Sequence, residues 1–216
     1  MTAAAARDRL QGARPIEHER LASLAQSGQL WGDIVAADAA LDEGDLTRAH
    51  AIIDAWRGSA RHPVLALRLG RLLRYDGKLT ESRAALEAAA KMRPARIELA
   101  LLDAETKEDR ERALAAPGER AEPEWPWLEA YLQARHGELE AARKTLAPLK
   151  NPDATAPLSL RMAAALALGG VQEVYRADPI VKPLFATWPR NPDVIRIGFA
   201  LKRLPVPALP VSQPPK

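Results

Sequence analysis

Histidine and carboxylate side chains can act as general acids, general bases and metal ligands, so their spacing is the first feature to examine. His18 stands between Glu17 and Glu19. These three residues lack the i, i+4 spacing that brings two ligands to one face of a helix. The spacing therefore indicates a solvated helix face and not a metal site. The other histidines lie far apart along the chain: His50, His62 and His136.

Other catalytic signatures are equally weak. Gly169-Gly170 is typical of a turn that ends a helix rather than of a loop that holds a nucleotide phosphate. No serine lies in a nucleophile elbow. Neighbouring carboxylates such as Glu138 and Glu140 fit exposed helix ends. We therefore predict no catalytic residue, no metal site and no cofactor, and we expect that the protein is not an enzyme.

Arginines with aromatic neighbours form the pattern that best suggests binding. Arg68, Arg71 and Arg74 recur every third residue, which places them along one side of a helix as a positive stripe. Such a stripe can pair with carboxylates of a peptide. Arginine is abundant throughout the chain, so the same stripe also fits an ordinary solvated surface. Trp125 and Trp127, on either side of Pro126, fit either core packing or a contact patch.

Composition favours a helical chain without disulfides. The 216 residues are 47% hydrophobic and 27% charged, with only 5% aromatic residues. The net charge of +3 does not by itself indicate a nucleic acid partner. Cysteine is absent, which excludes disulfides and thiolate zinc sites. No stretch reaches the roughly 18 apolar residues of a membrane span, and the first residues do not resemble a secretory signal, so we expect a cytoplasmic location.

Glycines recur at a nearly fixed interval and indicate a series of helix pairs. Gly44 and Gly77 are 33 residues apart, as are Gly137 and Gly170, and the middle gap is 60 residues. A period near 33 residues between helical patterns is typical of stacked helix pairs. The pattern predicts an all-α chain with helices at residues 3–11, 16–26, 31–43, 46–56, 63–76, 80–92, 95–105, 108–115, 127–136, 139–149, 158–168, 171–177, 180–187 and 193–204.

The pair over residues 63–94 resembles a tetratricopeptide repeat. That family has a leucine-glycine pair and an aromatic residue on its first helix, then a turn, then small, large and small residues before a proline. The corresponding residues here are Leu69, Gly70, Leu73, Gly77, Ser82, Leu86, Ala89 and Pro94. Ala66 replaces the usual tryptophan, and leucines replace both aromatics. The resemblance covers about residues 30–177.

The resemblance implies a right-handed superhelical solenoid whose first helices line a concave trough that binds a peptide or protein segment. We expect this partner to be acidic, with no nucleic acid partner and no membrane span. The alternative is a structural assembly subunit, or an accessory subunit of an enzyme or envelope complex. The trough positions predict a partner-binding set that consists of Trp31, Arg68, Arg71, Arg74, Tyr75, Trp127, Tyr131 and Arg135.

Four regions follow from these patterns. Residues 1–29 are expected to form leading helices, 30–177 the repeats, 178–204 irregular capping helices, and 205–216 a disordered tail with five prolines. The final helix is amphipathic and basic. A polar cap on the solenoid is the preferred interpretation, and attachment to a membrane surface is the second.

Overall fold

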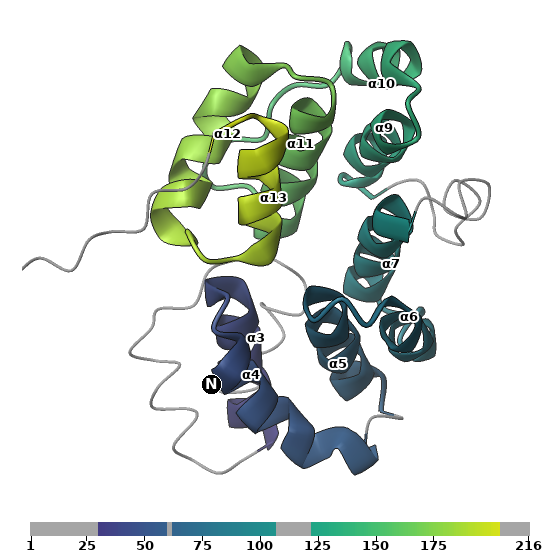
Figure 1. Ribbon diagram of the computed structural model, residues 1–216, viewed down its shortest axis with the longest axis vertical. Coiled ribbons are helices and arrows are strands. Elements are labelled where there is room, and N and C mark those ends of the chain that lie inside the picture. Colours follow the sequence, from purple (N-terminus) through teal and green to yellow (C-terminus); the bar gives the residue numbers. More distant parts are fainter. Residues whose placement is uncertain (1–29, 60–61, 107–121, 204–216) are drawn as a thin grey trace, which may run out of the picture.

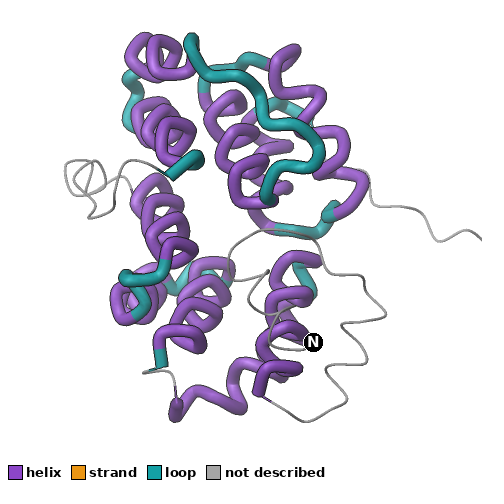
Figure 2. The backbone as a smooth tube through the Cα atoms, turned by 180° about the vertical axis from the view of Figure 1, so that it is seen from behind, coloured by secondary structure: helices purple, strands orange, loops and turns teal. Residues whose placement is uncertain are grey.

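The computed structural model describes residues 30–59, 62–106 and 122–203, and within these ranges it is helical with no strand (Figures 1 and 2). The prediction of an all-α chain is confirmed for this part. The expected helices at residues 3–11, 16–26 and 108–115 and the expected tail lie outside the described residues. The α-helices are α3 (Leu30–Glu43), α4 (Leu46–Ile53), α5 (Pro63–Tyr75), α6 (Leu79–Ala88), α7 (Arg93–Thr106), α9 (Trp125–Arg135), α10 (Leu139–Leu146), α11 (Leu158–Gly170), α12 (Val174–Thr187) and α13 (Pro192–Ala200).

One turn recurs between paired helices. Gly44, Gly77 and Gly137 have φ of 73°, 77° and 86°, the left-handed region that favours glycine. At each glycine the backbone N–H donates to the carbonyl three residues earlier, and the next N–H donates to the carbonyl five residues earlier. These bonds satisfy the free carbonyls at the end of the first helix. The chain then starts its second helix two residues after the glycine.

The fourth turn is centred on Gln172 and not on Gly170. Gln172 has φ of 63° and makes the same two backbone hydrogen bonds, to the carbonyls of Gly169 and, from Glu173, of Leu168. Gly170 instead is the last residue of α11, where an added Cβ would be 2.9 Å from the Cβ of Ala134 in α9. The glycine spacing therefore marks the end of α11, whereas the left-handed residue of the fourth turn stands two positions after Gly170.

Prolines in α12 do not divide it. The sequence predicts separate helices over 171–177 and 180–187, but α12 runs through Pro179 and Pro183. Each internal proline removes a backbone hydrogen bond at a cost of about 3 kcal/mol. Ala177, Ile180, Val181 and Leu184 are all buried in helical spacing across both prolines. The free energy gained by burying these four side chains outweighs the cost of the lost hydrogen bonds.

Small residues let the paired helices approach closely. An added Cβ at Gly70 of α5 would be 2.6 Å from the Cγ of Leu86 in α6. The Ser82 hydroxyl donates to the Gly70 carbonyl oxygen at 2.7 Å. Gly70 therefore allows α5 and α6 to pack closely, and Ala89, directly after α6, is fully buried.

Helix α13 returns toward the first helices of the chain. Its apolar residues Val194, Ile197 and Leu201 are buried in a cluster with α7, α9, α10, α11 and α12. Its N-terminal end faces α3 and α5 (Figure 1). In the turn before it, the carbonyl oxygen of Arg190 lies only 2.0 Å from where a Cβ would be on Gly44. The α12–α13 turn is thus seated against the α3–α4 turn.

Gly44→Ala should destabilise the protein more than Gly77→Ala. Both glycines have positive φ, which costs alanine about 1–2 kcal/mol. Only at Gly44 does the new Cβ collide with backbone, which adds roughly 1–3 kcal/mol, whereas Gly77 has no neighbour within 4 Å. Urea unfolding of both variants measures the difference. Equal losses would show that the two turns do not touch.

Candidate functional site

The three arginines of α5, here called the arginine face (Arg68, Arg71 and Arg74), point into the protein. Arg68 and Arg74 are each 1% exposed, and the side chain of Arg71 is 17% exposed. The expectation that these three arginines line an open trough is wrong, because their side chains are covered. The spacing does place them on one side of α5, as predicted, but that side is covered by other helices of the same chain.

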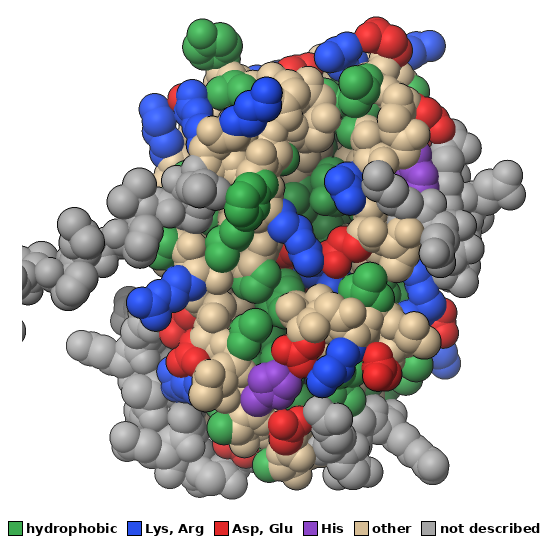
Figure 3. All heavy atoms as spheres, in the orientation of Figure 1, with side chains coloured by type: hydrophobic (Ala, Val, Ile, Leu, Met, Phe, Trp, Pro, Cys, Tyr) green, Lys and Arg blue, Asp and Glu red, His purple; other side chains and the backbone are tan. Residues whose placement is uncertain are grey.

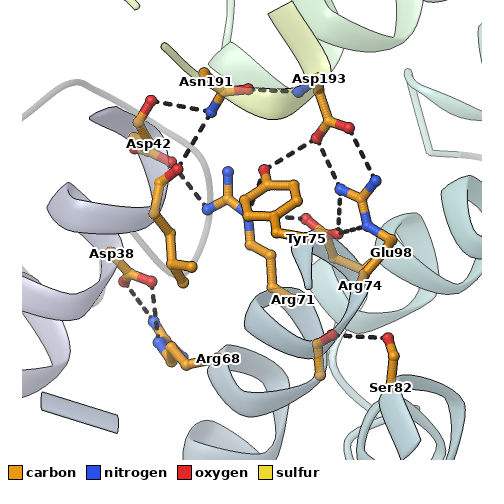
Figure 4. Close-up of polar contacts among 12 residues, drawn as sticks. Asp38, Asp42, Arg68, Arg71, Arg74, Tyr75, Ser82, Glu98, Asn191 and Asp193 are labelled. Atoms are coloured by element: carbon orange, nitrogen blue, oxygen red, sulfur yellow. Dashed lines mark hydrogen bonds and ion pairs between the residues drawn. The ribbon is translucent and has the colours of Figure 1, made fainter. Parts of the chain in front are cut away.

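Arg68 joins α5 to α3. Its Nε and Nη2 donate to the two carboxylate oxygens of Asp38 at 3.0 Å and 2.6 Å (Figure 4). Its Nη1 donates to the carbonyl oxygen of Val64, one turn earlier in α5. A guanidinium matches a carboxylate in this two-bond geometry. Arg68 is therefore satisfied within the protein.

Arg74 joins α5 to α7 and to α13. Its Nη1 and Nη2 donate to the two carboxylate oxygens of Asp193 at 2.8 Å and 2.7 Å. Glu98 and Glu105 of α7 accept from the same guanidinium at 3.0 Å and 2.6 Å. Arg196 of α13 also contacts Glu105 and Asp193. Figure 4 shows Arg74 between α7 and the beginning of α13.

Arg71 and Tyr75 complete the cluster. Arg71 pairs with Asp42 of α3 at 2.9 Å and with Glu98 of α7 at 3.3 Å. The Tyr75 hydroxyl accepts from Arg71 Nε at 3.2 Å and donates to Asp193 at 3.0 Å. The guanidinium carbons of Arg71 and Arg74 lie 5.5 Å and 4.9 Å from the centre of the Tyr75 ring. The Tyr75 ring thus makes cation–π contacts with both guanidinium groups, which stabilise their positive charges.

Asn191 fastens the start of α13 to the end of α3. Its side-chain oxygen accepts from the backbone N–H groups of Asp193 and Val194, which is the standard role of an asparagine N-cap. Its amide nitrogen donates to the carbonyl oxygens of Leu41 and Asp42 at 3.3 Å and 2.9 Å. One side chain therefore satisfies a helix N-terminus and a helix C-terminus together.

Arg74 and Asp193 hold each other in their ionised forms despite their burial. Burial by itself lowers the pKa of Arg74, but the carboxylates of Asp193 and Glu98 outweigh burial and hold that pKa well above its ordinary value. Burial opposes ionisation of Asp193, yet Arg74 lowers the pKa of that carboxyl well below its usual range. Glu105 differs, because burial raises its pKa despite Arg74 and Arg196. Opposite charges meet here at contact distance, so the arrangement fixes helices and offers no unpaired nucleophile or base.

The remaining predicted residues do not meet the arginine face at one exposed surface. Trp127 and Tyr131 are 4% and 7% exposed and belong to the core around α11. Arg176 lies 5.5 Å from the centre of the Trp127 ring. Arg135 is exposed and donates to the carbonyl oxygen of Ala104 at 3.1 Å. Trp31 lies in the first turn of α3, and its side chain is outside the described residues.

Sequence reasoning did not find the carboxylates that cover the arginine face. Asp193 is 119 residues from Arg74 along the chain. The only local signal is Asn191-Pro192-Asp193, which is typical of a helix start. That signal predicts where α13 begins but not which helix its first turn contacts.

Comparison of the chain with protein-family models, curated proteins and solved structures found no match. Within the described residues, no group of three or more His, Asp or Glu side chains is arranged so that it could hold a metal ion. In the same part of the chain no helix is long and apolar enough to cross a membrane.

The large apolar side chains most exposed among the described residues are Tyr175 of α12 and Phe199 of α13, at 93% and 67%.

Alkaline pH should destabilise the protein through Tyr75. Burial raises the pKa of Tyr75 far above its ordinary value. The unfolded chain ionises its tyrosines near pH 10 whereas folded Tyr75 stays neutral, so the stability that Tyr75 contributes is lost as the pH rises past 10. Tyr75→Phe should be less stable at neutral pH but show a weaker loss between about pH 8 and 11. Urea unfolding across that range tests this, and parallel curves for wild type and variant would contradict it.

Proposed function

We propose that the protein is a non-catalytic scaffold that binds another protein through a tetratricopeptide-like solenoid. The observation that carries the proposal is the recurrent turn. Gly44, Gly77, Gly137 and Gln172 have the same left-handed conformation and the same pair of hydrogen bonds, and each joins two packed helices. Helix pairs that recur in this way bury their apolar faces against neighbouring pairs and present extended surfaces to partners.

The binding surface is proposed to lie outside the arginine face. Those arginines already form ion pairs with the carboxylates of Asp38, Asp42 and Asp193. Exposed aromatic side chains are typical of energetic anchors in protein interfaces. Tyr175 and Phe199 have this character, and hydrophobic side chains reach the surface over α13 in Figure 3.

A capture experiment tests the scaffold function. The full chain, immobilised, is exposed to native lysate, in parallel with Phe199→Asp, Tyr175→Asp and Arg143→Glu, the last as a control on the exposed side of α10. We expect one set of proteins to be retained by wild type and by the control, and to be reduced at least tenfold by one aromatic variant. Retention of nothing above an empty resin, or equal retention by all four chains, contradicts the proposal.

A structural assembly subunit is the second candidate. Phe199, 67% exposed on the last described helix, favours it, because an exposed apolar side chain at the end of a helical array is suited to contact with another copy. Light scattering over a wide concentration range distinguishes the two. Self-association that Phe199→Asp abolishes would favour assembly, and a concentration-independent monomer would favour the scaffold.

A further inference from the structure

Arg161, near the start of α11, is a buried arginine without a carboxylate partner. Among the described residues, the arginines that are at least nine-tenths buried are Arg68, Arg74 and Arg161. Arg68 and Arg74 each donate two hydrogen bonds to the two oxygens of one aspartate. Arg161 is 7% exposed and forms no ion pair within the described part of the chain. Burial of a charge is costly unless an opposite charge offsets it, so Arg161 differs from the other two.

One hydrogen bond and one aromatic ring hold the Arg161 side chain in place. Its Nε donates to the carbonyl oxygen of Ala156 at 3.1 Å, and its guanidinium carbon lies 5.7 Å from the centre of the Trp188 ring. The terminal nitrogens, Nη1 and Nη2, have no acceptor among the described residues, and neither is sealed from solvent. The guanidinium is thus oriented by the protein while its two terminal nitrogens stay accessible.

The start of α11 adds positive potential at the same place. Ala156 stands two residues before Leu158, the first residue of α11, so the guanidinium lies beside this end of the helix. The N-cap residue, Pro157, makes no side-chain hydrogen bond, and the first turn contains no acidic residue. The unpaired N–H groups of a first turn carry partial positive charge, which disfavours a cation and favours an anion.

Asp153 is the carboxylate that acts on Arg161, but it does not form an ion pair with it. The Asp153 side chain is exposed, and its Oδ1 accepts from the N–H and the hydroxyl of Thr155 at 2.8 Å and 2.6 Å. The same oxygen accepts from the Ala156 N–H at 3.0 Å. These bonds hold the carboxylate in its own turn. Burial lowers the pKa of Arg161, and the charge of Asp153 only partly offsets this effect.

Glu124, the other carboxylate at this end of α11, is already paired. It is fully buried, accepts from the Ser159 hydroxyl at 2.6 Å and forms an ion pair with Arg93. Ser159 and Arg161 are two positions apart and therefore lie on opposite sides of α11. The positive charge of Arg161 is thus not neutralised by the described residues.

The buried cluster of α5 shows what completes such an arrangement. The guanidinium of Arg74 lies over the Tyr75 ring, and its two terminal nitrogens donate to the two oxygens of Asp193. Asp193 itself lies in the first turn of α13. Arg161 has the same two neighbours, an aromatic ring in Trp188 and the start of a helix, but no carboxylate. The chain's own example therefore identifies the missing partner as a carboxylate with both oxygens available.

We propose that Arg161, oriented by Trp188 and Ala156, binds an aspartate or glutamate side chain of a partner protein. This inference rests on the proposed scaffold function and names a contact by which the scaffold selects an acidic partner. A carboxylate matches Nη1 and Nη2 of a guanidinium in two parallel hydrogen bonds. The cost of keeping an unpaired arginine buried is then a feature of the free protein that binding relieves.

An acidic peptide tests the site directly. The probe is a peptide of three Gly-Ser-Glu repeats with blocked ends and an uncharged fluorescent dye, and the matched probe has glutamine in place of glutamate. Anisotropy is measured with the full chain at about 20 mM salt, where charge contacts are little screened. We expect Arg161→Gln to weaken binding of the glutamate probe about fivefold or more. Arg143→Gln, which removes the same charge from the exposed side of α10, should change it less than about twofold.

A change at Asp153 should act in the opposite direction. Asp153→Asn removes a negative charge near Arg161 but keeps an oxygen that can accept from Thr155 and Ala156. It should therefore tighten binding of the glutamate probe about twofold or more. Glu140→Gln is the control, because it changes the net charge equally at a side chain that is 90% exposed on α10. Equal effects of the two variants would show a general effect of charge and contradict the site.

The melting temperature separates a binding residue from a structural one. Arg161→Met removes an unpaired charge and keeps an apolar side chain against Trp188, so the melting temperature should stay within about 2 °C of wild type or rise. Arg74→Met removes a cation from among buried carboxylates and should lower it by about 6 °C or more. A loss for Arg161→Met as large as that for Arg74→Met would make Arg161 a structural contact and overturn the proposal.

The remaining outcomes are equally decisive. No binding of the glutamate probe, equal binding of the glutamine probe, or equal binding by Arg161→Gln would overturn the proposal. Sodium phosphate that displaces the probe at about 5 mM, where sodium chloride of the same ionic strength does not, would assign the site to phosphate instead. Any of these failures leaves the capture experiment valid, because a scaffold can bind elsewhere. Failure of capture with success here would remove the scaffold function and leave the carboxylate site established.

Discussion

Replacement of Arg74 by alanine should cost about 3–5 kcal/mol of the free energy of unfolding. Arg74 is 1% exposed and pairs with Asp193, Glu98 and Glu105. Its removal leaves three carboxylates close together in a buried place with their main cation missing. An uncompensated buried charge is among the few changes that produce a loss of this size. Urea unfolding followed by circular dichroism measures it.

Arg143→Ala is the matched control. Arg143 also pairs with a glutamate, Glu140, but this pair is on the surface of α10 with both side chains well exposed. An exposed pair of this kind contributes roughly 0.3–0.5 kcal/mol, so the variant should remain close to wild type. If Arg74→Ala lost no more than Arg143→Ala, Arg74 would have to be solvated, and the buried cluster would not exist as described.

Asp193→Ala should have the second-largest effect, a loss of about 3 kcal/mol or more. The change leaves Arg74 without its two-bond partner and Tyr75 without an acceptor. It also removes a negative charge from the first turn of α13, where the helix dipole favours one. The cluster is the contact that the structure gives between the start of α13 and α5, so the loss should appear as a lower unfolding midpoint.

The stability of the protein at acid pH should depend on the same carboxylate, Asp193. Arg74 holds the pKa of Asp193 well below its usual range against the effect of burial. The stabilisation is therefore complete above the unfolded value near 3.9 and is lost as the pH falls below it. Glu105 acts in the opposite sense, since burial raises its pKa. Between about pH 5 and 2, the free energy of unfolding should fall less for Asp193→Ala than for wild type. Parallel curves of unfolding free energy against pH for the two proteins would contradict the role of Asp193.

Local signals in the sequence predict most of the described helices and three of the four turns between paired helices. Gly44, Gly77 and Gly137 mark turns because a left-handed residue is a local requirement that glycine meets best. Gln172 meets the same requirement without being glycine, so spacing alone placed the fourth turn two residues early. The continuous α12 was missed for a related reason. The burial that offsets Pro179 and Pro183 comes from tertiary packing.

The arginine face shows the limit of reasoning from sequence. The three-residue spacing correctly places Arg68, Arg71 and Arg74 on one side of α5, but exposed and buried arginines have the same spacing. What buries them is the arrival of Asp38, Asp42 and Asp193 from other helices. A double charge reversal at Arg71 and Arg74 is thus expected to unfold the protein, although the same change on an exposed stripe would leave the fold intact.

The pairing of Arg74 with Asp193 is the central claim, since it joins the end of the described chain to α5. A double-mutant cycle with Arg74→Ala, Asp193→Ala and the double variant, all measured by urea unfolding, tests it most directly. Two residues in contact within one ionic cluster should show a coupling energy of about 1–3 kcal/mol, with the double variant less destabilised than the sum of the single losses. Losses that add to within about 0.5 kcal/mol would show that the two side chains do not interact, and would contradict the closure of the fold by α13.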